Sequence, residues 1–169
     1  MKQIIVLRHA KSSWDNLTID DYDRELNERG KNDATLMSQL FGQKVAVPDA
    51  IVCSGARRVI ETLEIMKEHN SRLPDYTVNE NLYLAEENIL ECVISETPND
   101  INTLMICGHN PGLSDLVREM TGKRIEDIPT NSVVVVDTKM DEWTDIYHAR
   151  GVIEGFYFPK MFKEEIHHH

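Results

Sequence analysis

Residues 4–14 read IIVLRHAKSSW: four consecutive apolar residues and then, directly, Arg8 and His9. A strand that shows no polar alternation is buried on both faces, as in a parallel sheet covered by helices. Residues 103–112 read TLMICGHNPG and repeat the arrangement, because an apolar run stops at Gly108 and His109 follows. Segments of helical period come after both runs, so the sequence predicts an α/β fold.

The rest of the chain continues this alternation. Further strands are predicted at 50–53, 77–78, 133–136 and 144–148, with 133–136 central and 144–148 at an edge. Helices are expected after the N-cap Asn27, over 59–66, over 86–96 and from Pro111 onward. No repeat or linker interrupts the pattern. We therefore expect a single domain over 1–166, a three-layer α/β/α structure with a mostly parallel central sheet, and a purification-tag remnant at 167–169.

Composition narrows the class of protein. Lysine and arginine number 18 against 29 aspartate and glutamate residues, a net charge of −11. So acidic a chain is a poor candidate for a nucleic-acid or membrane partner. There is no apolar run long enough to span a membrane, and the N-terminal apolar stretch is too short for a signal peptide. Cys53, Cys92 and Cys107 are expected to be reduced, which together with these features predicts a cytoplasmic protein.

Three polar segments follow predicted strands. Arg8 and His9 follow the first, His109 follows the strand at 103–107, and Arg57 and Arg58 open the helix after 50–53. Ligands of open α/β sheets bind at the carboxyl ends of the strands, where these segments should meet. Arginine forks match phosphate oxygens, and a neutral imidazole is a nucleophile near pH 7. The pattern indicates a site for a phosphoryl group.

The order of these motifs resembles the histidine phosphatase superfamily, and within it the small SixA-type phosphohistidine phosphatases. The resemblance begins at Arg8-His9-Ala10 and covers nearly the whole chain. Its further members are Lys11–Asp15, Leu26–Gly30, Ser54…Arg58…Thr62, Leu82–Ala85, Gly108–Gly112, Pro129-Thr130, Trp143 and Phe158–Lys160. A phosphoglycerate mutase-like fold is what this resemblance implies.

The resemblance also implies roles for individual residues. His9 would be the nucleophile that becomes phosphorylated, Arg8 and Arg58 would hold phosphate oxygens, and His109 would stabilise the transferring group. Arg58 is preferred to Arg57 because it stands four residues after Ser54 and four before Thr62. No metal and no cofactor are implied. Further candidates for substrate binding are Ser12, Arg57 and Asn110, although Arg57 also fits an exposed ion pair.

Two features depart from the family pattern. Relatives that act on phosphate esters carry a glutamate that protonates the leaving oxygen, and only Glu80 and Glu86 lie in the corresponding part of this chain, without its motif. Asp15 stands where many mutase-like members have an asparagine that contacts phosphate. A carboxylate there would repel phosphate, so Asp15 is expected to point away or to orient a neighbour.

The expected activity is hydrolysis of a phosphohistidine through a covalent phospho-His9, because a P–N bond breaks without a strong acid. The partner would be a protein that bears phosphohistidine, such as a histidine-phosphotransfer domain, or a small phosphorylated substrate. Alternatives are a phosphatase for a small phosphate ester, with Glu80 or Glu86 as acid, and a non-catalytic phosphate-binding module. The sequence does not indicate an oligomeric state.

Other polar residues are expected to be structural. His69 suits a helix C-terminus, and His148 is predicted outside the site. Cys53 and Cys107 are predicted to be core strand residues. Asp21-Tyr22-Asp23 follows no strand and is predicted to be a solvated loop, with Trp14 as a loop anchor at the edge of the site.

Overall fold

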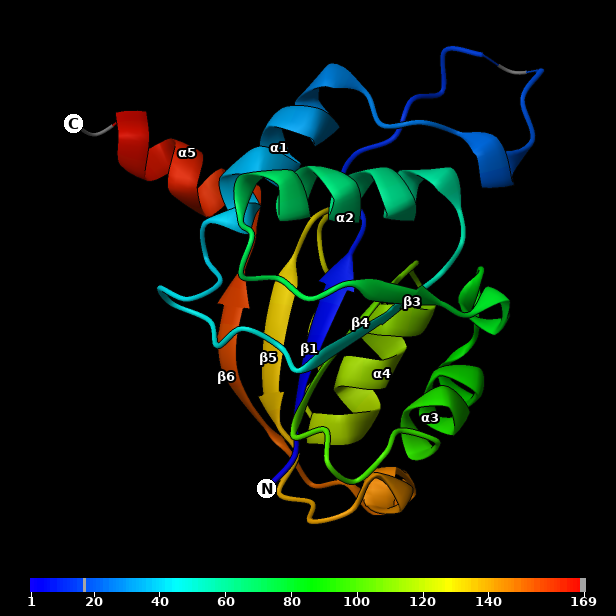
Figure 1. Cartoon of the computed structure of the whole chain (residues 1–169), viewed down its shortest axis with the longest axis vertical. Coiled ribbons are helices and arrows are strands. Elements are labelled where there is room, and N and C mark those ends of the chain that lie inside the picture. The colour runs from blue at the N-terminus through cyan, green and yellow to red at the C-terminus, as the bar shows by residue number, and fades with distance from the viewer. Residues whose placement is uncertain (17, 168–169) are drawn as a thin grey trace.

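One six-stranded sheet, in the order β3-β2-β4-β1-β5-β6, forms the centre of the molecule (Figure 1). The computed structural model describes residues 1–16 and 18–167, so His168 and His169 of the expected tag lie outside the described residues. The strands are β1 (Gln3–Arg8), β2 (Ala50–Cys53), β3 (Tyr76–Val78), β4 (Thr103–Gly108), β5 (Val133–Asp137) and β6 (Val152–Tyr157).

Strands β3, β2, β4 and β1 run parallel to one another, which confirms the mostly parallel sheet. β5 has a neighbour on each side but pairs antiparallel with β1, and β6 pairs antiparallel with β5. The run of four valines in β5 is fully buried, and its composition contains no information about direction. Its antiparallel course brings the N-terminal end of β5 to the edge where β1 ends.

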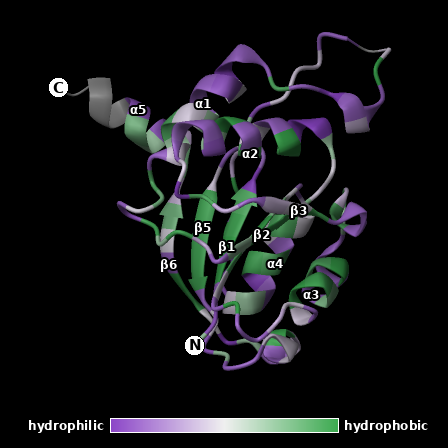
Figure 2. Ribbon diagram, viewed as in Figure 1, coloured by the Kyte–Doolittle hydropathy of each residue, from purple (hydrophilic) through white to green (hydrophobic). Residues whose placement is uncertain are grey.

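Helices cover both faces of the sheet (Figure 1). α1 (Glu28–Ser38) and α2 (Arg57–His69) lie on one face, and α3 (Glu87–Ser95) and α4 (Gly112–Thr121) lie on the other. Alternate residues of β1 supply the two cores: Ile5 and Leu7 pack in the α1–α2 cluster, and Ile4 and Val6 in the α3–α4 cluster. Figure 2 shows these strands as hydrophobic between more polar helical faces. The three-layer prediction is confirmed.

The C-terminal part differs from the prediction. Residues 143–148 form the 3-10 helix η3 (Trp143–His148) rather than a strand, because Trp143 and Ile146 are both buried and stand three residues apart. The edge strand is instead β6, where a register shift opposite Gly155 disturbs the alternation that sequence reasoning relies on. α5 (Pro159–His167) follows and contacts α1. No helix within the described residues is both long and apolar enough to cross a membrane.

The N-terminus of α1 holds the loop that follows β1. Asn27 caps the helix by accepting a hydrogen bond from the Gly30 amide at 2.8 Å, as predicted, and its own amide donates to the Lys11 carbonyl at 3.0 Å. A Cβ on Gly30 would lie 2.1 Å from that carbonyl oxygen. Only glycine lets the helix approach the loop this closely.

Gly30→Ala therefore forces the loop around Lys11 away from α1. We expect a loss of stability of about 1–3 kcal/mol, typical of overpacking, and a fall in Tm of several degrees. Differential scanning calorimetry measures the change directly. An unchanged Tm would show that the loop moves without cost and that α1 does not fix it.

Candidate active site

Four strand ends bring the predicted residues to one edge of the sheet. Arg8 is paired with Gly108 in the parallel β1–β4 ladder, so His9 and His109 leave the sheet side by side. Cys53 is paired with Cys107, which places Ser54 next to them. The segment before β5 completes the edge, because the Asn131 amide donates to the His9 carbonyl at 2.9 Å.

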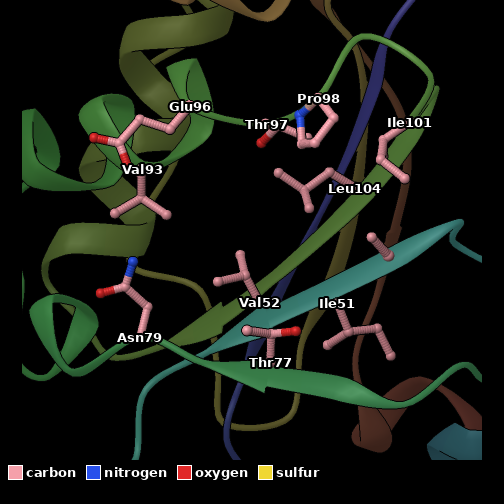
Figure 3. Close-up of a pocket in the computed structure, with 11 residues that line it drawn as sticks. Ile51, Val52, Thr77, Asn79, Val93, Glu96, Thr97, Pro98, Ile101 and Leu104 are labelled. Atoms are coloured by element: carbon pink, nitrogen blue, oxygen red, sulfur yellow. The ribbon is translucent and has the colours of Figure 1, made fainter.

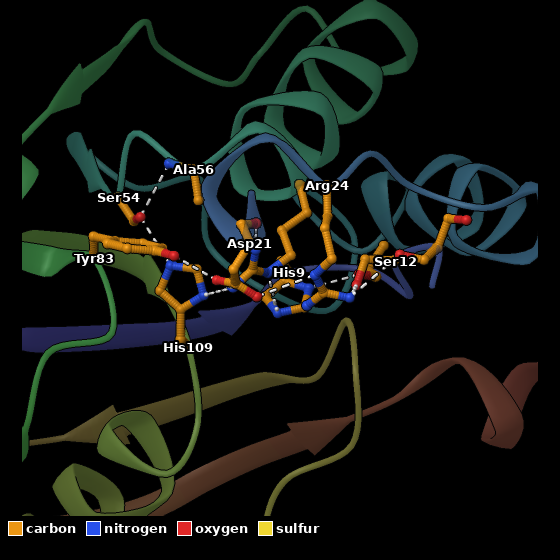
Figure 4. A network of polar contacts seen from close by, with 11 residues as sticks. His9, Ser12, Asp21, Arg24, Ser54, Ala56, Tyr83 and His109 are labelled. Carbon is orange, nitrogen blue, oxygen red and sulfur yellow. Dashed lines mark hydrogen bonds and ion pairs between the residues drawn. The ribbon is translucent and has the colours of Figure 1, made fainter. Parts of the chain in front are cut away.

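A cavity of about 300 Å³ opens at this edge. Four cationic side chains and a single carboxylate line it, which makes it locally basic in an acidic molecule. Its polar core is a continuous network of hydrogen bonds and ion pairs (Figure 4). The lining residues are Arg8, His9, Lys11, Ser12, Trp14, Asp21, Arg24, Arg58, Leu84, His109, Asn110 and Thr130.

His9 is held as one tautomer of the neutral imidazole. Its Nδ1 lies 2.6 Å from the Ala10 carbonyl oxygen, a contact that requires a proton on Nδ1. Its Nε2 lies 3.3 Å from Nε of Arg58, which can only donate, so Nε2 is unprotonated and its lone pair accepts this hydrogen bond. Burial, followed by the charges of Arg58, His109 and Arg8, outweighs the Ala10 hydrogen bond and lowers the pKa of His9 to about 3. The ring can therefore act as a nucleophile through Nε2 at neutral pH.

Arg58 connects the parts of the site. Its side chain is almost fully buried, and its Nη2 donates to Oδ2 of Asp21 at 3.1 Å and contacts Nδ1 of His109 at 3.2 Å. Its Nη1 donates to the Asp21 carbonyl at 2.7 Å. Together with the contact to His9, this fixes one guanidinium between both imidazoles and the only carboxylate of the cavity.

The tautomer of His109 follows from the same argument. Because Arg58 donates to Nδ1, the proton of the neutral ring is on Nε2, which lies 2.8 Å from Oγ of Ser54. The ring centroids of His9 and His109 are 5.5 Å apart. Burial and the charge of Arg58 lower the pKa of His109 to about 3, although the carboxylate of Asp21 acts in the opposite direction.

Arg8 has a donor that no described residue satisfies. Its Nη1 donates to the Ile128 carbonyl at 2.9 Å, while its buried Nε has no hydrogen-bond partner in the described part of the chain. A buried unsatisfied guanidinium N–H is costly, and an anion in the cavity would relieve that cost. Arg8 is thus suited to bind an oxyanion.

Asp21 belongs to the site, and the prediction of a solvated loop at 21–23 is wrong. It begins the 3-10 helix η1 (Asp21–Asp23) and accepts hydrogen bonds from Tyr83 at 2.5 Å, Arg58 at 3.1 Å and Arg24 at 3.1 Å. Burial alone would raise the pKa of Asp21, but the Tyr83 hydroxyl and the Arg58 charge outweigh it and lower the pKa to about 2. Asp21 is therefore ionised at neutral pH and orients both arginines.

Arg24 and Tyr83 were not predicted as site residues, although Tyr83 lies in the Leu82–Ala85 segment of the family resemblance. Arg24 reaches the cavity from the segment after η1 and donates to Oγ of Ser12 at 2.9 Å. The edge of Tyr83 meets the His109 ring at a centroid distance of 5.5 Å. Neither residue follows a strand, so the rule that identified the other site residues does not identify these two.

The three further binding candidates lie in different places. Ser12 and Asn110 both line the cavity. Ser12 accepts a hydrogen bond from Arg24, and the side-chain amide of Asn110 is bonded to the Ile128 carbonyl and to Ser114. The structure does not bring Arg57 into the cavity. Its half-exposed guanidinium pairs with Glu25 at 3.1 Å and with Glu61 at 3.7 Å.

The two candidate acids, Glu80 and Glu86, do not line the cavity, and neither does Asp15. Glu80 accepts hydrogen bonds from the Tyr22 hydroxyl at 2.8 and 2.9 Å, and Glu86 precedes α3 as its N-cap residue. Asp15 is exposed and also lies outside the lining, as expected. The buried thiols of Cys53 and Cys107 have raised pKa values because of burial, that of Cys53 reaching about 12.

The two histidines make stability depend on pH. In the unfolded chain a histidine takes up a proton near pH 6.5, whereas His9 and His109 do so only near pH 3. Stability is therefore lost as the pH falls from 6.5 towards 3, by about 2 kcal/mol per histidine between pH 7 and 5. In urea unfolding at these two pH values, we expect His9→Gln to lose about 2 kcal/mol less than the wild type. His69→Gln, at an exposed position, is the control, and equal losses in all three proteins would contradict the neutral state of His9.

A second cavity, of about 260 Å³, lies between β2, β3 and the end of α3 (Figure 3). Its walls are mainly aliphatic, with Ile51, Val52, Val93 and Leu104 among them. Glu96 is the only ionisable residue in its lining, so it lacks the converging polar groups that a reaction requires. Nowhere in residues 1–16 and 18–167 do three His, Cys, Asp or Glu side chains cluster as metal ligands.

Comparison with known proteins gives consistent results. An uncharacterised protein of Mycobacterium tuberculosis is 29% identical over 164 residues, which cover 91% of this chain and all of that protein. Among solved structures, the protein histidine phosphatase SixA complexed with tungstate has a TM-score of 0.78 and 22% identity, with 95% of this chain and 99% of that chain covered. A protein described as a SixA phosphohistidine phosphatase from Agrobacterium tumefaciens has a TM-score of 0.80 and 24% identity, with 94% and 98% covered.

The family model of the histidine phosphatase superfamily (branch 1) matches residues 4–86. This range contains β1 with Arg8 and His9, η1 with Asp21, and the start of α2 with Arg58. The solved structures share the fold over nearly the whole chain, including the part with β4 and His109. The chain belongs to branch 1 of the histidine phosphatase superfamily.

Proposed function

We propose that the protein hydrolyses phosphohistidine through a covalent phospho-His9 intermediate. The observation that carries this proposal is the fixed tautomer of His9, whose Nδ1–H is bonded to the Ala10 carbonyl and whose unprotonated Nε2 lies beside Arg58 in the lining of the basic cavity. Arg8 and Arg58 neutralise the phosphoryl oxygens. Nδ1 of His109 lies 3.2 Å from Nη2 of Arg58, which places the second imidazole beside the same guanidinium.

In the first step, Nε2 of His9 attacks phosphorus, and the P–N bond to the substrate imidazole breaks. The substrate ring leaves as neutral imidazole when its other nitrogen carries a proton, so no proton has to come from the enzyme. The Ala10 carbonyl keeps the proton on Nδ1 of His9, and the phosphorylated ring is therefore a cation. That positive charge makes His9 in turn a good leaving group.

In the second step, water attacks phosphorus and the bond to Nε2 breaks. Inorganic phosphate retains the protons of the water, and His9 returns to its neutral state with the proton on Nδ1. The net reaction consumes one water for each phosphohistidine. Asp21 acts here by positioning Arg58, to which it is bonded through both its carboxylate and its carbonyl.

None of the described residues brings a protonated carboxylic acid into the cavity lining, which supports a phosphoramidate over an alkyl phosphate ester as the substrate. Glu80 and Glu86 do not line the cavity, and Asp21 has a pKa of about 2 and is ionised. Imidazole has a reference pKa of about 6.5 and water about 15.7, a gap that amounts to roughly 12 kcal/mol in leaving-group stability at most. An alkoxide cannot easily leave without an acid, whereas imidazole can.

The substrate would be a protein that carries phosphohistidine, such as a histidine-phosphotransfer domain. The cavity is at the small end of the size range of ligand sites, which suits a single side chain. Tungstate, with which the related SixA structure was solved, is an oxyanion like phosphate.

A panel of substrates tests the proposal. The kcat/KM for free phosphohistidine is measured beside those for glucose 6-phosphate and glycerol 3-phosphate, with a chelator present throughout. We expect phosphohistidine to be preferred by at least about a hundredfold, as the difference in leaving group requires. Faster turnover of a phosphate ester would replace this function by an ester phosphatase, and no turnover of any substrate would leave a phosphate-binding module.

A further inference from the structure

Two large apolar side chains border the mouth of the cavity. The side chains of Trp14 and Leu84 are 67% and 53% exposed, and both line the candidate active site. Of the large hydrophobic residues exposed in the described part of the chain, only these two line it. We call Trp14 and Leu84 the apolar rim.

Trp14 is exposed but held in position. The guanidinium of Arg24 lies 3.5 Å from the centre of one of its rings, and Arg24 is itself bonded to Asp21 and Ser12. The indole is thus attached to the network that surrounds His9. Its remaining surface faces solvent beside the cavity and offers an apolar contact that is already ordered.

Leu84 is in a backbone conformation that leucine rarely adopts, with φ at +49°. Both neighbours are fixed: the hydroxyl of Tyr83 is bonded to Asp21, and the Ala85 carbonyl touches α4 where a Cβ on Gly112 would lie only 2.1 Å away. Glycine would fit this backbone at less cost. Because the leucine side chain is half exposed, its burial in the folded chain does not account for its presence.

We infer that the apolar rim is the docking surface for the folded protein that carries the phosphohistidine, an inference that rests on the proposed function. When a side chain enters the cavity, the polypeptide around it comes to lie over Trp14 and Leu84. A free phosphorylated amino acid leaves both side chains in water. The partner surface would have apolar side chains beside its phosphohistidine, and an acidic one for the exposed Lys11, which also lines the cavity.

The test compares two substrates of the same chemistry and different size. Free phosphohistidine and a histidine-phosphotransfer domain phosphorylated with phosphoramidate are hydrolysed by the wild type and by the double variant Trp14→Ala/Leu84→Gly. We expect the ratio of kcat/KM for the phosphorylated domain to kcat/KM for free phosphohistidine to fall about tenfold or more, as for the loss of central interface contacts. The fall should be mainly in KM.

Matched controls are available elsewhere on the surface. Tyr147 and Val152 are 52% and 51% exposed and do not line the cavity. The double variant Tyr147→Ala/Val152→Ala therefore also removes exposed apolar side chains, and it should leave kcat/KM unchanged for both substrates. Equal losses for both substrates, or none for the phosphorylated domain, would overturn the docking surface while the proposed function stands. If the wild type hydrolyses neither free phosphohistidine nor the phosphorylated domain, the proposed function fails and the inference fails with it.

Discussion

We expect His9→Ala to abolish the proposed phosphoenzyme and to lower turnover of phosphohistidine by about 10⁴-fold or more, the size of effect seen when a covalent nucleophile is removed. The expectation follows from the proton that the Ala10 carbonyl holds on Nδ1 of His9, which leaves Nε2 unprotonated in the cavity. The measurement is the intact mass after brief mixing with phosphoramidate and a cold acid quench. The wild type gains one phosphoryl group transiently, and the variant gains none.

His69→Ala is the matched control. His69 is exposed at the end of α2, with its Nδ1 2.9 Å from the Ile65 carbonyl, and lies outside the cavity. This variant should form and lose the phosphoenzyme at the wild-type rate. Hydrolysis that survives His9→Ala without any adduct would remove His9 from its role and refute the covalent mechanism.

Arg58→Ala is expected to lower kcat/KM by about 10³-fold, the scale on which a single arginine contributes to phosphoryl transfer. Arg58 contacts His9, His109 and Asp21, so its loss removes a phosphate ligand and also leaves the carboxylate of Asp21 without its main cation. Arg58→Lys restores the charge but cannot make these contacts together, because an ammonium lacks the planar fork. We therefore expect Arg58→Lys to recover only a small part of the activity.

Arg57→Ala is the matched control, since Arg57 is the same type of residue as Arg58 and directly precedes it in α2. Arg57 is half exposed and paired with Glu25 and Glu61, and such surface pairs contribute little to stability. Its kcat/KM should stay within about threefold of the wild type. A large loss in Arg57→Ala, with little loss in Arg58→Ala, would reverse the assignment of the two arginines.

The sequence was sufficient to predict which residues meet at the sheet edge. Arg8, His9, Arg58 and His109 all follow or lie close to the ends of parallel strands, and parallel strands end at the same edge. The site roles of Asp21 and Tyr83 could not be predicted from the sequence, for a physical reason. Their contact joins a 3-10 helix to a turn 62 residues later, and neither segment has a periodicity that fixes its position.

Two features of the fold could not be predicted from the sequence: the direction of strand β5 and the helical conformation of residues 143–148. The valine run of β5 is equally compatible with a parallel and an antiparallel course, and only the pairing with β1 decides between them. At 143–148, burial of Trp143 and Ile146 on one side of a 3-10 helix determines the structure, against the β-propensity of Thr144, Ile146 and Tyr147.

The hydrogen bonds of Arg58 bear on how strongly the site retains anions. In the resting site its guanidinium is already bonded to His9, His109 and Asp21. A phosphoryl group that binds Arg58 must therefore replace some of these hydrogen bonds, and the bonds form again when phosphate leaves. Part of the attraction between the cationic cavity and phosphate is offset in this way. In the proposed reaction, this arrangement favours rapid release of phosphate over storage of a phosphoryl group.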